Sequence, residues 1–431
     1  MSSTKGKLGL FMLIALVTGN MVGSGAFLIP AGIARIGSIG LTSLIFTSVG
    51  ALCLALVFSK MSLLVPKTGG PYVYANAGFG EYMGFQTAYY YWLGAWVGNA
   101  AIVVAALGYI NVFFPVLDDP VNKTIAILSI IWSLTIVNII GIRFAGFIQI
   151  FTTILKFAPL LLIGIVGWWY FNPEYLTQNF NVTTESNLST FSFGITLTLW
   201  LFVGVESATI PANSIKNPKR NIPLATLLGT AIAAVIYILS NTAIFGMLPN
   251  DILANSTSPF AAAANIILGA WGKFFVAGGA IIACLGTLNG WTLVAAQIPM
   301  AGAHDGIFPK IFGKCRRPGI PTFSLIITSL LISTLVLASS YLNLIEQFDF
   351  LIISASTACL VAYFYTSVAE IIVLPKKILD RKTIFHIVIA ILAAAYSFYA
   401  ILGSTKEVLF LSLAFLLLTI PLYAIFKWKR K

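Results

Sequence analysis

Twelve long apolar segments divide this chain of 431 residues. Each runs for roughly 18 residues or more, which is enough for an α-helix to cross the hydrocarbon core of a bilayer. Membrane-spanning β-strands would instead alternate over about 10 residues. Only 9% of the residues are charged, whereas a soluble domain carries about 25%. The pattern predicts an all-α membrane protein with twelve transmembrane helices, centred near residues 20, 49, 97, 133, 160, 202, 235, 285, 331, 362, 393 and 417.

The basic residues predict how the chain is oriented. Of the 25 Lys and Arg residues, twenty fall at the chain ends and in loops on one side of the predicted bilayer, and four fall on the other side. The positive-inside rule places the crowded side and both termini in the cytoplasm. The net charge of +12 therefore reflects contact with the lipid bilayer, and we expect no nucleic-acid partner. The first apolar segment is too long for a cleavable signal peptide, so residues 1–431 are expected to form a single membrane domain.

Glycine interrupts the first and the sixth apolar segments near their middles. The first interruption reads GNMVGSG at residues 19–25, and the second reads WLFVGVES at residues 200–207. A broken helix leaves backbone groups unpaired, which lipid does not tolerate unless they face protein or a water-filled cavity. Two breaks at corresponding positions in two halves indicate the substrate site of a secondary transporter.

A polar stretch at residues 171–191 separates the first five predicted spans from the next five. Because five is odd, the second group starts on the opposite side of the membrane, so two halves of like fold form an inverted repeat. We expect the first repeat at residues 8–170, the second at 192–373, and helices eleven and twelve within 384–427. The short apolar segment 258–268 predicts a surface helix before the eighth span.

The backbone chemistry of the two breaks predicts the ligand. The amides of Ser24 and Gly25 begin a new helix after Gly23, and a helix N-terminus suits a carboxylate. Freed carbonyls near Met21, and from Trp200 onward, suit an ammonium group. A carboxylate and an amine held side by side describe an α-amino acid. The alternative is a packing kink with trapped water.

Two ionisable side chains fall deep within predicted spans. Glu206 follows the second break and Lys156 lies in the fifth span. A charge at that depth costs about 2.5–3.5 kcal/mol on insertion scales, so both are functional candidates. Glu206 would carry a proton or hold a gate, and Lys156 would titrate or supply a fixed positive charge. The alternative is structural pairing with carbonyls or hydroxyls. His304 and His386 are isolated in sequence and expected at the surface, and no metal or cofactor motif is present.

Four further side chains stand out by position. Trp200 precedes the second break, and Trp291 follows a flexible GTLNG stretch in the eighth span. A tryptophan face attracts a buried ammonium or guanidinium by about 2 kcal/mol. Tyr91 and Asn99 are eight residues apart in the third span, which puts them on one helix face. The two tryptophans suit a cationic ligand, and Tyr91 and Asn99 allow a shared cavity. The alternative is helix packing or an interfacial aromatic belt.

Across nearly its whole length the chain resembles the amino acid–polyamine–organocation (APC) family. Within that family it is most similar to the bacterial arginine/agmatine antiporters, and next to the putrescine/ornithine antiporters. The resemblance implies a leucine-transporter-type 5+5 inverted repeat with helices 1 and 6 broken, and a homodimer in the bacterial inner membrane. It is carried by residues 19–30, 69–80, 91–99, 198–207, 217–223, 290–293 and 305–312.

The resemblance also implies roles for individual residues. Ser24 and Gly25 would bind the substrate carboxylate, and carbonyls of three residues would bind its amino group: Met21, Trp200 and Val203. Trp291 would stack on the cationic side chain, and Asn99 would contact the side chain's polar end. Trp200 would also close over the substrate. A second gate would be formed by Tyr91, Glu206 and Tyr363.

The sequence departs from the arginine/agmatine antiporters in its side-chain pocket. Ala95 and Ile102 replace a cysteine and a methionine, and Ala355 stands where a contacting serine is expected. Lys156 has no counterpart there. It resembles the lysine that replaces sodium in proton-coupled or sodium-independent transporters of the superfamily. The resemblance to these antiporters therefore supports the roles of the backbone groups better than the roles of the side chains in the pocket.

Together these observations predict a sodium-independent antiporter that exchanges a cationic amino acid for its amine, of the arginine/agmatine type. The alternative is a proton-coupled or exchanging transporter of neutral or other amino acids. A substrate sensor would need a signalling domain or a long tail. A membrane enzyme would need a cluster of catalytic groups at one depth.

Overall fold

The computed structural model describes residues 9–67, 69–140, 145–209, 215–315, 320–374 and 380–428, with side chains of 145–154 left out. These residues form helices joined by turns and loops, with no β-sheet among them. Nine helical segments in the described chain are long and apolar enough to cross a membrane. The all-α fold is therefore confirmed. Shorter apolar helices lie where spans five, six and nine were predicted, at Leu155–Tyr170, Asn187–Phe202 and Thr322–Ala338, and the count of twelve spans stays a prediction.

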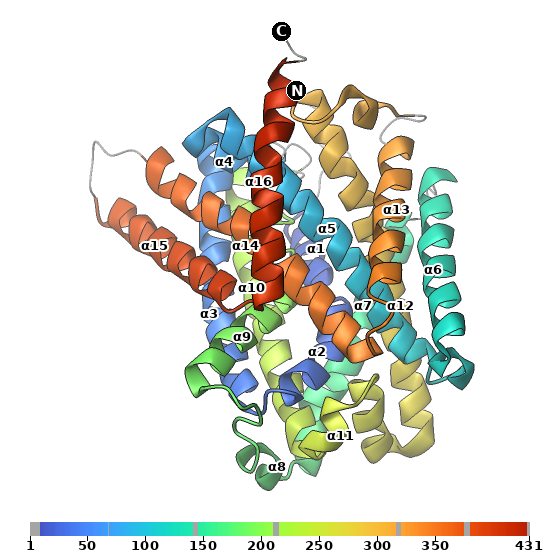
Figure 1. Ribbon diagram of the computed structural model, residues 1–431. Helices are drawn as coiled ribbons and strands as arrows, with labels where there is room; N and C mark the ends of the chain where they lie inside the picture. Colours follow the sequence, from blue (N-terminus) through green and yellow to red (C-terminus); the bar gives the residue numbers. More distant parts are fainter. Residues whose placement is uncertain are drawn as a thin grey trace.

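The first half of the chain contains eight α-helices and two 3₁₀ turns (Figure 1). They are α1 (Leu10–Met21), α2 (Ser24–Ala34), α3 (Ile39–Leu64), α4 (Pro71–Phe79), α5 (Glu81–Ile110), η1 (Pro115–Asp118), α6 (Pro120–Ile140), α7 (Ala145–Val166), η2 (Gly167–Tyr170) and α8 (Pro173–Thr177).

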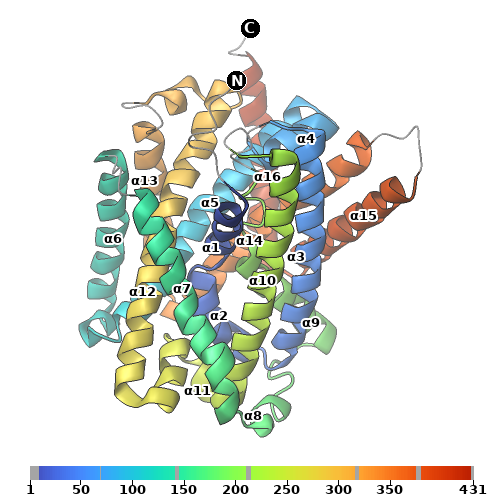
Figure 2. The same ribbon diagram turned by 180° about the vertical axis from the view of Figure 1, so that it is seen from behind.

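The second half follows in the order α9 (Asn187–Leu199), η3 (Trp200–Phe202), α10 (Pro218–Met247), α11 (Asn250–Ala254), α12 (Pro259–His304), η5 (Lys310–Gly313), α13 (Thr322–Ala338), α14 (Leu344–Val373), α15 (Arg381–Leu402) and α16 (Lys406–Trp428). Helix α4 lies at one end of the molecule, and α8 and α11 lie at the other (Figure 1). In both views α6 and α15 occupy opposite flanks (Figure 2).

The predicted break in the first span is confirmed. Helix α1 ends at Met21, Val22 (φ −77°, ψ 89°) and Gly23 (φ −132°, ψ −146°) leave the helical region, and α2 begins at Ser24. Every residue of α2 is buried. The chain therefore turns inside the protein, where neighbouring elements shield the freed backbone groups from lipid.

The second predicted break is also present. Helix α9 tightens into η3, which ends at Phe202, and Gly204 adopts φ +111°, a left-handed conformation that favours glycine. Residues 203–209 form turns, so the helix does not resume by Thr209, and 210–214 lie outside the described residues. A Cβ on Gly204 would lie 3.3 Å from the backbone carbonyl carbon of Asn20. The two breaks therefore lie against each other.

Helix packing follows a reciprocal pattern. Helix α1 packs on α10, and α9, the equivalent element of the second half, packs on α3. In the same way α5 packs on α14 while α12 packs on α7. Exchanging the first five spans with the second five converts each pair into the other, as expected if the two halves share a fold. The inverted arrangement of the halves stays a prediction.

The long helix α12 is bent at Gly269, which has φ +65°. The bend separates residues 259–268 from the rest of the helix, so a short helix does precede the eighth span. It is half buried, however, and does not lie wholly on the surface as predicted. Beyond the bend, α12 packs against α5 and α7. This packing brings its middle residues to the two breaks.

Candidate functional site

A small, largely closed cavity lies at the two breaks. The wall comes from both halves of the chain: the α1–α2 break, α5, the second break, α12 and α14. The lining residues are Asn20, Met21, Gly23, Ser24, Gly25, Tyr91, Gly94, Ala95, Gly98, Asn99, Ile102, Trp200, Val203, Thr287, Trp291 and Cys359.

The start of α2 supplies hydrogen-bond donors to this cavity. Ser24 and Gly25 occupy the first turn of the helix, where backbone amides have no partner within the helix. The Gly23 amide is already used, because it donates to Met21 O at 2.9 Å. The Ser24 hydroxyl is buried and has no hydrogen-bond partner among the described residues. This corner of the cavity therefore suits an anion.

The two breaks also supply acceptors. Met21 O accepts the Gly23 amide, and Trp200 O accepts the Val203 amide at 3.4 Å. A carbonyl oxygen has two lone pairs, so each retains capacity for an ammonium group. Because the breaks lie against each other, donors and acceptors line one small cavity. The predicted combination of carboxylate and amine chemistry is geometrically present.

Trp200 lies across the cavity between two glycines. A Cβ on Gly25 would lie 2.5 Å from Trp200 Cδ1, and one on Gly98 would lie 2.5 Å from Trp200 Cη2. The ring thus spans from α2 to α5. Trp291 lines the wall from α12, and Asn99 lies fully buried on α5 with neither Oδ1 nor Nδ2 bonded within the described chain.

Beside the cavity, Glu206 joins three elements. Its carboxylate accepts hydrogen bonds from Tyr91 Oη and Tyr363 Oη, each at 2.6 Å, and from the Gly204 amide at 3.3 Å. All three side chains are buried. Tyr91 belongs to α5 and Tyr363 to α14. The predicted trio is therefore brought together, and Tyr91 alone among the three also lines the cavity.

Comparison with known proteins decides the family. The family model described as "Amino acid permease" matches residues 8–421. The chain belongs to the amino acid permease family. This family is part of the APC superfamily, so the resemblance to that superfamily is confirmed, while the particular similarity to arginine/agmatine antiporters stays a prediction.

The permease's similarity to several relatives extends nearly from end to end. The cadaverine/lysine antiporter of Escherichia coli (strain K12) is 34% identical over 411 residues, covering 94% of this chain and 91% of the relative. The putrescine transporter PotE of the same strain is 33% identical over 404 residues, covering 93% and 92%. PotE of Haemophilus influenzae is 32% identical over 409 residues, covering 94% of each chain. The relatives are transporters, and the permease is not an enzyme.

Lys156 of the permease lies outside the cavity wall. Its side chain is fully buried in α7, and Nζ donates to Gly19 O at 3.3 Å. Gly19 is in the last turn of α1, whose carbonyls lose their helical partners at the break. The ammonium therefore sits behind the first break, where it compensates a helix C-terminus.

Two residues singled out in the sequence have other surroundings than expected. Ala355 is buried but does not line the cavity: its carbonyl oxygen would lie 3.2 Å from a Cβ on Gly94, so it packs against α5. Cys359, one turn further along α14, lines the cavity instead. Thr287 was also missed, although it lies one turn before Trp291 on α12 and a search at helical spacing would have found it.

The second residue is His386. It is isolated in sequence, but in the fold its side chain is only partly exposed, and its Nδ1 lies 3.4 Å from Oε1 of Glu370, a fully buried acid of α14. Sequence reasoning missed Glu370 as well. Its signal was the same as for Glu206, a lone acid in an apolar span.

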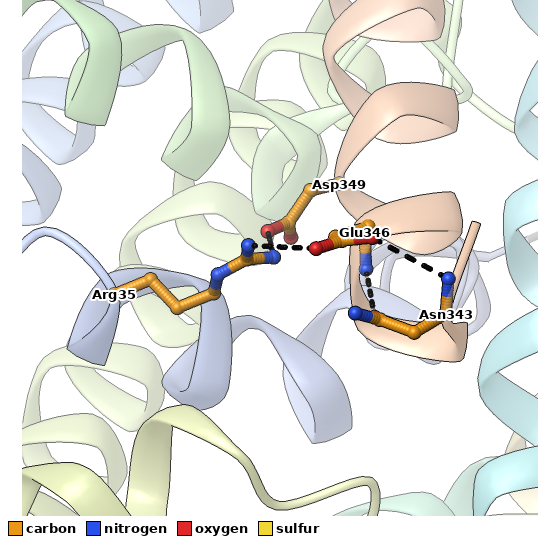
Figure 3. A network of polar contacts seen from close by, with 4 residues as sticks. All are labelled: Arg35, Asn343, Glu346 and Asp349. Atoms are coloured by element: carbon orange, nitrogen blue, oxygen red, sulfur yellow. Dashed lines mark hydrogen bonds and ion pairs between the residues drawn. The ribbon is translucent and has the colours of Figure 1, made fainter.

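A charged cluster joins α2 to α14 (Figure 3). Arg35 follows the last residue of α2, and its guanidinium lies 3.2 Å from Asp349 Oδ2 and 3.6 Å from Glu346 Oε1. Glu346 also forms a capping box with Asn343 at the start of α14. The buried half-helix α2 is thus tied by its far end to the second half of the permease.

Proposed function

We propose that this permease exchanges a cationic amino acid for the amine formed by its decarboxylation, across the bacterial inner membrane and independently of sodium. The observation that carries the proposal is the cavity at the two breaks. Unpaired amides of α2, accepting carbonyls and the Trp291 ring face one space. An amino acid uses all three groups, whereas its amine uses the last two.

A cationic side chain suits the lining because of how that lining compensates charge. No Asp or Glu is among the lining residues described. The side-chain charge would therefore be held by the Trp291 face, the Asn99 amide oxygen and carbonyl dipoles. These interactions bind a cation less strongly than a buried ion pair would. Weaker binding suits an exchanger, because it must release its substrate on both sides of the membrane.

The first pair to test is lysine and cadaverine, because a relative of 34% identity carries that name. Arginine and agmatine are the second pair, and ornithine and putrescine are the third. The predicted roles of the lining residues belong to this proposal, as do the gate formed by Tyr91, Glu206 and Tyr363 and the positive charge of Lys156 in place of sodium.

The architecture is part of the same proposal. The reciprocal helix packing supports two inverted five-span repeats at residues 8–170 and 192–373, followed by two helices in 384–427. Alternating access would then rock one repeat against the other around the cavity. Both termini in the cytoplasm follow from the distribution of Lys and Arg. The homodimer implied by the resemblance remains a prediction.

A second candidate is a proton-coupled transporter of neutral or other amino acids. It is favoured by one observation: Glu206 and Lys156 are both buried ionisable groups beside the breaks. In that case the cavity would bind a substrate without a cationic side chain, and proton movement rather than internal amine would drive uptake.

Transport in proteoliposomes separates the two. Vesicles are loaded with cadaverine, agmatine, putrescine or buffer, and uptake of labelled lysine, arginine, ornithine or leucine is followed in sodium or choline medium. We expect uptake of a cationic amino acid that requires its internal amine and ignores sodium. Uptake into empty vesicles that follows an imposed proton gradient, with leucine preferred, would establish the second candidate.

A further inference from the structure

Thr287 presents a hydroxyl to the cavity that the structure does not otherwise use. The residue is 4% exposed, and Oγ1 has no hydrogen-bond partner in the part of the chain that is described. Buried hydroxyls in helices commonly donate to the carbonyl one turn earlier. Thr292 on the same helix does so, bonding Leu288 O at 2.7 Å. The Thr287 hydroxyl is therefore left available to a ligand.

The hydroxyl lies beside the first break. A Cβ on Gly23 would lie 2.8 Å from Thr287 Cγ2 and 3.4 Å from Oγ1. Gly23 immediately precedes the free amides of α2, and the Ser24 hydroxyl next to it is also unpartnered. The anion-binding corner thus combines a helix N-terminus with two buried hydroxyls that come from different halves of the chain.

We propose that Thr287 is a specificity-determining residue that distinguishes the amino acid from its amine. Its hydroxyl donates a hydrogen bond to the substrate carboxylate, beside the amides of Ser24 and Gly25. The amine has no carboxylate, so it gains nothing from this donor. Thr287 therefore sets the affinity for one exchange partner relative to the other. The inference rests on the proposed function.

The expected change in affinity follows from the kind of hydrogen bond that is lost. A hydrogen bond to a charged group changes an affinity on the order of 10- to 100-fold. If Thr287 served only in packing, its replacement by Val would leave the affinity unchanged, because Val keeps the shape of Thr and leaves the contact with Gly23 intact. Replacement of Thr287 by Val therefore separates the hydroxyl from the methyl group.

The test compares binding of two ligands to purified full-length permease. Affinities for lysine and cadaverine are measured by equilibrium binding to wild type, T287V, T287A and T287S, with T292V as the matched control on the same helix. If another pair is exchanged in the transport assay, its amino acid and amine are used. We expect T287V and T287A to weaken the amino acid about 10-fold or more without changing the amine. T287S and T292V should resemble wild type.

Lysinamide provides a second readout. Replacing the carboxylate by an amide removes the charge that Thr287 is proposed to bind, so T287V should weaken lysinamide far less than lysine. Equal loss of amino acid and amine in T287V, or no loss of either, overturns the inference. Failure of the proposed function looks different, since wild type then shows no exchange of any amino acid–amine pair.

Discussion

Lys156 Nζ donates to the carbonyl oxygen of Gly19 at 3.3 Å, so a cation on α7 compensates the end of α1 where the first span breaks. A hydrogen bond from a charged donor contributes about 1.5–3 kcal/mol. K156M keeps the length of the side chain and removes its charge. We expect exchange in proteoliposomes to fall on the order of 10-fold or more.

The matched control for K156M is K123M. Lys123 also donates to a carbonyl, that of Leu342, at 3.3 Å. It lies at the start of α6, far from the breaks in sequence. K123M should transport like wild type. Wild-type rates in K156M would show that the ammonium is not needed at this break.

Glu206 accepts a separate tyrosine hydroxyl on each carboxylate oxygen. In E206Q one of these oxygens becomes an NH₂ group, which cannot accept, so Tyr91 or Tyr363 loses its buried partner. We expect slower exchange and a flatter dependence of the exchange rate on pH, measured in proteoliposomes between acidic and neutral pH.

Y363F is the companion variant to E206Q. It removes one hydroxyl while keeping an ionisable Glu206, so it should slow exchange and preserve the shape of the pH profile. An unchanged pH profile in E206Q would exclude a proton-linked role for the glutamate.

Trp291 lines the cavity from α12. If its ring holds a cationic side chain, W291L should weaken binding of lysine by roughly 30-fold, the equivalent of about 2 kcal/mol. Binding of norleucine, which lacks the terminal ammonium, should change much less. W291F keeps a ring and should lie between the two. Equal weakening of lysine and norleucine would exclude the cation–π role.

Arg35 ties α2 to α14, yet its side chain is 38% exposed. Its pair with Glu346 is exposed on both sides and contributes about 0.2–1 kcal/mol, whereas the Asp349 side chain is only 15% exposed and loses its cation in R35Q. R35Q should therefore lower the melting temperature modestly and loosen this end of the molecule. Native Cys359, which lines the cavity, reports the change through its labelling rate with a membrane-impermeant maleimide.

Labelling of Cys359 requires a C315S background, because Cys315 is exposed. In R35Q, Cys359 should be labelled faster than in the parent protein. K123Q removes another of the few cations predicted on the outer side and should not change the labelling rate. Unaltered labelling in R35Q would show that the cluster does not control access to the cavity.

His386 is the partner of the buried Glu370. H386A leaves a buried carboxylate unpaired, which destabilises by about 1–3 kcal/mol. The double variant H386A/E370Q removes the charge together with its partner and should recover part of this loss. Thermal unfolding in detergent compares H386A, E370Q and the double variant with wild type. Additive effects of the two single substitutions would show that the pair is not coupled.

The breaks were predictable because their signal is local. Glycines and a glutamate inside an apolar span have few structural explanations, and the residues concerned are contiguous. Which side chains reach the cavity depends on position along a helix as well as on its face. Ala355 and Cys359 lie one turn apart on nearly the same face of α14, and both lie near Gly94 of α5, but only Cys359 lines the cavity.

Long-range pairs were harder to predict. His386 and Glu370 lie on different helices, and the sequence around either residue does not predict its partner. Thr287 was obscured by composition, because small residues in the eighth span are equally expected from close helix packing. The role proposed for Thr287 rests on the structure, in which its hydroxyl lies beside Gly23 without a hydrogen-bond partner among the described residues.

The contact between Gly204 and Asn20 has a kinetic consequence. When cargo leaves, bare amides and carbonyls remain turned toward one another with nothing to neutralise them. Under the proposed exchange mechanism we therefore expect the vacant carrier to reorient more slowly than the loaded one. One molecule would then enter for each that departs.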